Sequence, residues 1–113
     1  MDDRERAQRS RATFDRSASG FDHPALRLFA LTGQAMAEGA SLTGHEQILD
    51  VAAGTGSTTI PFAHRVPRGK VTAIDISPAM LAITAERAEA AGLSTILTGG
   101  VVTGTEDRVS LDR

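Results

Sequence analysis

The sequence has no cysteine, which excludes disulfides, thiolate nucleophiles and cysteine metal sites together. It has no tryptophan, no tyrosine and only four phenylalanines, so few large aromatic side chains can fill a core. No apolar run approaches the ~20 residues of a membrane span, and the first five residues are too charged for a signal peptide. A Gly-Lys-Ser/Thr sequence is also missing, which excludes a P-loop. We therefore expect a soluble cytoplasmic protein with no membrane partner.

Net charge and chain length limit which partners and which fold we expect. The 113 residues carry a formal net charge of −2, which gives no electrostatic reason to expect nucleic acid as a partner. A doubly wound fold needs two βαβαβ halves, and this length holds about one half and an extension. We therefore expect an incomplete α/β fold that forms the N-terminal portion of a larger one. Its oligomeric state is not indicated.

A glycine turn follows the first clear strand. Ile48–Val51 combines aliphatic residues with one acid and reads as a buried strand. Gly54 and Gly56 then let the backbone turn sharply and lie close to a ligand without a Cβ in the way. A segment compatible with a helix runs from Ser57 to Arg65, where Pro61 is tolerated only near the beginning. A strand followed by a glycine turn and a helix predicts the first part of a nucleotide-binding βαβ unit.

A second strand, Val71–Asp75, ends in a carboxylate. Asp75 lies 19 positions after Gly56, close to the ~20 expected between a glycine turn and the acid that binds ribose hydroxyls. A ribose diol offers two O–H donors, and both oxygens of an ionised carboxylate accept them. The turn and the acid together are a stronger signal than either alone.

Two segments carry a resemblance to a known family. They are Asp50–Gly56 and Ala73–Leu81, within a stretch from about Gln47 to Leu93, and a weaker likeness covers Thr13–His23. The chain resembles the class I S-adenosylmethionine-dependent methyltransferases, in particular their ubiquinone/menaquinone-biosynthesis-like small-molecule branch. One departure is Ala52, which stands where the family often has its first glycine. The resemblance implies a Rossmann-like parallel sheet, S-adenosyl-L-methionine as cofactor and a small-molecule methyl acceptor.

The resemblance also implies roles for individual residues. Asp50 would order the glycine turn and the methionine end of the cofactor, and Asp75 would hold the ribose; the alternative for both is a solvated strand-end carboxylate. Residues after the ribose acid would press on the adenine face, although Met80 can equally fill a gap in the core. The expected cofactor-binding residues are Asp50, Ala52, Gly54, Thr55, Gly56, Asp75, Ile76 and Met80.

No catalytic residue is identified. Methyl transfer mainly requires that donor and acceptor be aligned and water excluded, so recognisable residues are expected to bind rather than to act as acid or base. Any general base is expected outside this portion of the fold. His23, His45 and His64 show no ligand spacing, so we expect them at the surface and predict no metal site.

Residues 1–46 are predicted to form a helical extension that also acts as a lid. Acids interleave with arginines over Met1–Ser19, which favours a solvated, partly helical tail over a nucleic-acid-binding arm. Phe14 and Phe21 can shield the reactive sulfonium from water, or simply anchor a loop. A helix is expected to start at His23-Pro24 and to end at Gly39. Its apolar stripe, which we expect to pack, is Leu26, Phe29, Ala30, Gly33, Met36 and Ala37.

Residues 47–98 are predicted to form the cofactor-binding βαβ core. Ser77 and Pro78 are suited to start a helix that runs to about Ala91 and stops at Gly92. A third strand is predicted over 94–98.

Residues 99–113 read as an atypical tail. The family would place a Gly-Asp pair after the third strand, whose acid meets the adenine amino group, and no acid stands at that point, which leaves adenine selection open. One hypothesis is a shift of reading frame near Gly99 or Gly100 that truncates the protein.

Two other functions stay open. A nicotinamide-dependent oxidoreductase fragment would have a third glycine where this chain has Thr59, so the turn fits that class less well. A non-catalytic remnant or binding module that keeps half a site would explain the short chain and the atypical tail.

Overall fold

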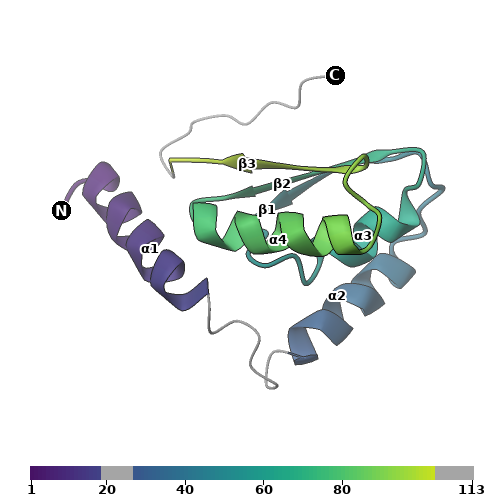
Figure 1. Cartoon of the computed structure of the whole chain (residues 1–113), viewed down its shortest axis with the longest axis horizontal. Helices are drawn as coiled ribbons and strands as arrows, with labels where there is room; N and C mark the ends of the chain where they lie inside the picture. Colours follow the sequence, from purple (N-terminus) through teal and green to yellow (C-terminus); the bar gives the residue numbers. More distant parts are fainter. Residues whose placement is uncertain (19–26, 104–113) are drawn as a thin grey trace.

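The computed structural model describes residues 1–18 and 27–103 of the chain. In this part a parallel sheet with the strand order β1-β2-β3 is combined with helices (Figure 1). The predicted α/β class, a Rossmann-like parallel sheet with an N-terminal helical extension, is confirmed. The elements in chain order are α1 (Asp3–Ser17), α2 (Arg27–Gly39), β1 (Gln47–Val51), α3 (Thr59–Arg65), β2 (Lys70–Asp75), α4 (Pro78–Ala90) and β3 (Leu97–Val101).

Helices α3 and α4 connect the strands and lie on one face of the sheet, in front of it in Figure 1. The core lies between these helices and the strands, where apolar side chains are removed from water. Its buried members are Ala63, Val66, Val71, Ala88, Leu93 and Leu97. Since all strands are parallel, their carboxyl ends meet at one edge of the sheet, with Val51 level with Ile74 and Asp75 level with Val101.

Strand β1 lies at a border of the sheet. It pairs with β2, and among the described strands it has no second neighbour. Its burial is correspondingly low, and Val51 at its end is 66% exposed.

The chain leaves β1 through a turn with three left-handed residues, Ala52 (φ 57°), Gly54 (φ 60°) and Gly56 (φ 94°). The N–H of Ala53 donates to a β2 carbonyl at 3.0 Å, and the N–H of Gly56 donates to the Ala53 carbonyl at 3.2 Å. A left-handed φ strains any residue that has a Cβ, so Ala52 is a strained position. At Gly56 the left-handed φ favours glycine, and a Cβ would in addition lie only 3.2 Å from side-chain atoms of Thr84.

Helix α3 begins at Thr59, two residues later than expected, because residues 54–58 form the turn. The N–H of Ile60 donates to the Gly56 carbonyl at 3.0 Å and so attaches the helix to the end of the turn. Pro61 is the third residue of the helix, where its missing N–H removes no intrahelical bond. The prediction that Pro61 is tolerated near the helix start is confirmed.

Helix α4 has the predicted capping residues. The Ser77 hydroxyl accepts a hydrogen bond from the Met80 N–H at 3.1 Å, and Pro78 occupies the first helical position. The helix ends at Ala90, and Gly92 follows with a left-handed φ of 73°.

Strand β3 begins three residues later than predicted and continues to Val101. The N–H groups of Ile96 and Leu97 both donate to the Leu93 carbonyl, at 3.0 and 2.9 Å, so the chain is still turning where the strand was expected. The strand therefore extends beyond position 98, the predicted end of the core, and includes Gly99 and Gly100.

Helix α2 corrects one expectation. It ends at Gly39 as predicted. Its expected start at residues 23–24 lies outside the described residues, and so does Leu26. Gly33 and Ala37 are buried, but Phe29 is 61% exposed and Met36 is 54% exposed, so the apolar stripe is only partly packed. The buried side of α2 is the side that contacts the turn before α3. The contact is close, since a Cβ on Gly33 would lie 2.2 Å from the Ser57 carbonyl oxygen.

Replacing Ala52 by glycine should stabilise the protein. Glycine removes the left-handed strain but adds freedom to the unfolded chain, so we expect a net gain of about 0.5–1 kcal/mol in the free energy of unfolding. Urea unfolding followed by circular dichroism measures the change. The matched control is Ala53→Gly in the same turn, at a residue without a left-handed φ, which should lower stability; equal losses in both variants would contradict the argument.

Glu46 provides a pH-dependent contribution to stability. Its carboxylate accepts hydrogen bonds from the N–H and hydroxyl of Thr43 and from the N–H of Gly44, and these bonds lower its pKa from 4.5 to about 2. Because the pKa is lower in the folded state, this contribution is complete above about pH 4.5 and disappears as the pH falls towards 2. We expect the difference in urea midpoint between the wild type and Glu46→Gln to shrink over this range. Glu86→Gln, at an exposed position on α4, should show no such trend.

Candidate functional site

Two hollows open at the carboxyl end of the sheet, one on each side of the turn after β1. The β1 pocket, of about 250 Å³, is lined by Phe29, Thr32, Asp50, Ala52, Ala53, Gly54, Thr55, Ser57 and Thr58. The β2 pocket, of about 300 Å³, is lined by Phe14, Val51, Ala52, Gly54, Ile74, Asp75, Ile76, Met80 and Val102. Both pockets reach Ala52 and Gly54, so the turn forms the wall between them. Ligands of open α/β sheets bind at this edge.

Asp75 fixes the turn from the end of β2. One carboxylate oxygen accepts from the Gly54 N–H at 2.8 Å, and the other accepts from the Ser77 N–H at 2.9 Å. The side chain therefore points towards the glycine turn, and Asp75 is only 7% exposed. Each carboxylate oxygen has a further lone pair, so the group can still accept from hydroxyls in the β2 pocket.

Asp50 makes a hydrogen bond across the turn. Its carboxylate accepts from the Thr59 hydroxyl at 2.6 Å, at the first residue of α3. This bond joins β1 to the residue that follows the turn, while Asp75 bonds to the turn itself at Gly54. Asp50 lines the β1 pocket, where it contributes the one carboxylate among the lining residues.

The two glycines of the turn also have different roles. Gly54 lines both pockets, and no atom lies within 4 Å of the position that a Cβ would take, so its surface is open to a ligand. Gly56 is buried against Thr84 and Ile60 and lines neither pocket. The expectation of close ligand approach therefore fits the geometry at Gly54, whereas Gly56 serves the packing of the turn.

Thr55 lies between the glycines and is held by α4. Its side chain and its carbonyl oxygen accept from the Arg87 guanidinium at 3.2 and 3.1 Å, and Thr55 lines the β1 pocket. The neighbouring Gly54 carbonyl accepts from the Thr84 hydroxyl at 2.7 Å. The middle of the turn is thus attached to α4 through polar side chains.

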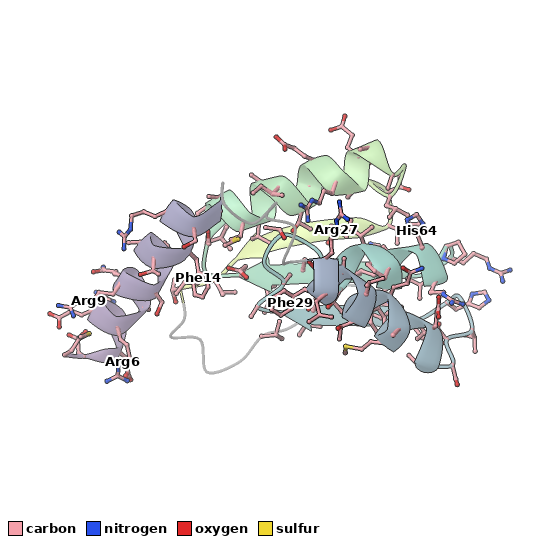
Figure 2. The ribbon with its side chains drawn as sticks, turned by 90° about the horizontal axis from the view of Figure 1, so that it is seen from below. Arg6, Arg9, Phe14, Arg27, Phe29 and His64 are labelled. Carbon is pink, nitrogen blue, oxygen red and sulfur yellow. The ribbon has the colours of Figure 1, made fainter. Side chains whose placement is uncertain are left out.

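Ile76 and Met80 both line the β2 pocket, as expected of residues beside a bound base. Met80 is buried on α4 and Ile76 is half-buried in the preceding loop. Phe14 reaches the same pocket from α1, and Figure 2 shows its side chain on the side of α1 that faces the sheet. Phe21, the second predicted lid residue, lies outside the described residues.

Sequence reasoning missed the residues that attach α1 to the site. The Arg11 guanidinium donates to the Ile76 carbonyl at 2.8 Å and to the Val102 carbonyl at 2.7 Å. The Asp15 carboxylate accepts from the Ser77 hydroxyl and from the Ala79 N–H. These contacts span more than sixty residues of sequence, so no local pattern could indicate them. The segment read as a solvated tail is therefore a docked helix at this point.

The described part of the chain shows no converging metal-ligand cluster, meaning a group of three or more His, Asp or Glu side chains. His45 and His64 are exposed, and His23 lies outside the described residues. None of the helices described for residues 1–18 and 27–103 is long and apolar enough to cross a membrane.

Comparison with known sequences identifies relatives of this chain. A family model described as a methyltransferase domain matches residues 48–107, more than half of the chain. The matched segment runs past Gly99 and Gly100. Over 48 residues the chain is 44% identical to the demethylmenaquinone methyltransferase of Thermus thermophilus, covering 42% of this chain and 22% of that protein.

Solved structures share the fold. A SAM-dependent methyltransferase from Aquifex aeolicus is 25% identical, with a TM-score of 0.60 over 74% of this chain and 44% of that one. The [4+2]-cyclase SpnF is 30% identical, with a TM-score of 0.56 over 65% of this chain and 26% of that one. The chain spans less than half the length of each of these relatives. The matched segment, the parallel sheet and the glycine turn all point to the same family. The chain belongs to the methyltransferase domain family and has the class I fold that its sequence predicts.

Proposed function

We propose that this chain is the cofactor-binding portion of an S-adenosylmethionine-dependent methyltransferase that acts on a small-molecule acceptor. The observation that carries the proposal is the position of Asp75. Its carboxylate is fixed by the N–H groups of Gly54 and Ser77 at the border of the β2 pocket, where a ribose diol can donate to it. Family membership and the Thermus thermophilus relative, a methyltransferase by name, support the reaction class.

The two pockets fit the two ends of this cofactor. The β2 pocket is largely apolar and suits the adenosine end, while Asp50 gives the β1 pocket a negative charge that suits the ammonium group of the methionine end. The open surface of Gly54 lies between them, where the sulfonium would sit. When bound, the cofactor supplies a methyl group that is already strongly electrophilic. The residues here therefore bind, orient and exclude water, and we assign none of them as acid or base.

We assign the segments of the chain accordingly. Residues 47–98 would bind the cofactor, and residues 1–46 would cover it, because α1 is hydrogen-bonded to the loop after β2 and places Phe14 at the β2 pocket. The function of residues 99–113 is not assigned, although β3 begins before position 99 and continues into this segment.

The reaction itself needs a direct test, because the fold also occurs in a [4+2]-cyclase and a fold does not determine a reaction. We place the protein in the cytoplasm and expect neither a nucleic-acid nor a membrane partner.

Calorimetric titration tests cofactor binding. S-adenosylhomocysteine should bind with one-to-one stoichiometry and raise the melting temperature by several degrees, because a ligand that binds only the folded state stabilises it. NADH at the same concentration should give no saturable heat. Tighter binding of NADH would favour the oxidoreductase alternative, and binding of neither compound would favour the non-catalytic remnant.

Asp50→Asn tests the methionine end of the site. The amide oxygen can still accept from the Thr59 hydroxyl, but the negative charge in the β1 pocket is lost. We expect S-adenosylhomocysteine to bind about tenfold more weakly, which corresponds to a charge-assisted hydrogen bond of roughly 1.5 kcal/mol. Asp3→Asn makes the same chemical change on the exposed face of α1 and should leave the affinity unchanged. An unchanged affinity in Asp50→Asn would remove Asp50 from the site.

A further inference from the structure

Helix α4 contacts the glycine turn through two side chains that line neither the β1 pocket nor the β2 pocket. Thr84 is 1% exposed, and its hydroxyl donates to the Gly54 carbonyl at 2.7 Å. The Arg87 guanidinium donates to the Thr55 carbonyl at 3.1 Å. Residues three positions apart lie on the same face of a helix. One face of α4 therefore holds two consecutive carbonyl groups of the turn.

The Thr84 hydroxyl is directed at the turn rather than at its own helix. A threonine hydroxyl inside a helix commonly donates to the carbonyl four residues earlier, which here belongs to Met80. That carbonyl is 3.4 Å away, whereas the Gly54 carbonyl is 2.7 Å away. The shorter bond shows which acceptor the buried hydroxyl serves.

Gly54 is held through both of its backbone groups. Its N–H donates to the Asp75 carboxylate at 2.8 Å, and its carbonyl accepts from Thr84. Glycine has the greatest backbone freedom of all residues, so such a turn needs external contacts to stay in one conformation. A trans peptide places its C=O and N–H on opposite sides, so rotation of the peptide unit after Gly54 would reverse both groups. The bond from Thr84 opposes that rotation.

We propose that Thr84 is a positioning residue, which keeps the Gly54 carbonyl turned towards α4 and thereby presents the open side of Gly54 to a bound cofactor. This inference rests on the proposed function. Without the hydroxyl, the peptide unit after Gly54 would adopt other orientations as well. A ligand that fits one orientation binds more weakly by the fraction of molecules that have it, although the fold itself persists.

The first test is a calorimetric titration of the whole chain with S-adenosylhomocysteine. Thr84→Val keeps the shape of the side chain and removes the donor, so we expect binding about tenfold weaker than in the wild type. Thr84→Ser keeps the donor, and its Kd should stay within about threefold of the wild-type value. Equal Kd values in the wild type and Thr84→Val would overturn the inference and leave the proposed function intact. No binding by the wild type would overturn both.

A matched variant on the same helix separates positioning from a general loss of stability. Ala88 is 2% exposed in the core and lines neither pocket. Ala88→Gly should lower the melting temperature, because glycine destabilises a helix interior, but its Kd should equal that of the wild type. If the affinities of Thr84→Val and Ala88→Gly both fall in step with their melting temperatures, the inference is wrong.

Amide hydrogen exchange, followed by NMR without ligand, reports on the turn directly. In Thr84→Val the Gly54 N–H should exchange faster relative to the amides of β2, because the turn opens locally. In Ala88→Gly the ratio between these exchange rates should stay at its wild-type value. An unchanged ratio in Thr84→Val would contradict the proposal. If melting curves show that Thr84→Val does not fold, Thr84→Ala, which also removes the donor, takes its place in every test.

Discussion

The carboxylate of Asp75 is the group on which the site depends. Its two oxygens join the turn after β1, through Gly54, to the start of α4, through Ser77. Removing either bond would leave a nearly buried carboxylate oxygen with fewer partners, and a charged group in that position is costly to leave unpaired. The same side chain therefore has a structural task before any ligand arrives. Since that task fixes its orientation, the proposed contact with a ribose would need little further ordering of this side chain.

The second structural constraint is the docking of α1, which forms part of the site although it is far away in sequence. Arg11 joins the loop after β2 to the residue after β3, and Asp15 contacts the first turn of α4. Phe14 lies between these two polar residues in the helix and completes the β2 pocket. Figure 1 shows α1 beyond the strand ends, apart from the helices on the face of the sheet. The wall of the pocket is thus assembled from four separate segments, and polar side chains of α1 attach that helix to the others.

Local sequence patterns predicted the sheet, the turn and the capping of α4, because each follows from a few adjacent residues. The sequence also predicted that the second strand ends at Asp75, since the interval from the glycine turn to the end of the next strand is set by the helix between them. It assigned the ordering of the turn to Asp50 and did not predict that Asp75 also bonds to the turn, because that contact joins residues 21 positions apart. The contacts of Arg11 and the exposure of Phe29 depend on how helices dock, which a single sequence does not encode locally.

The border position of β1 has a consequence for the protein in solution. Among the described strands β1 has one neighbour, so no described strand pairs with the amide and carbonyl groups along its other side, where the exposed Val51 lies at the end. Any extended peptide segment of matching length can add there as a further strand, including the same strand of another molecule.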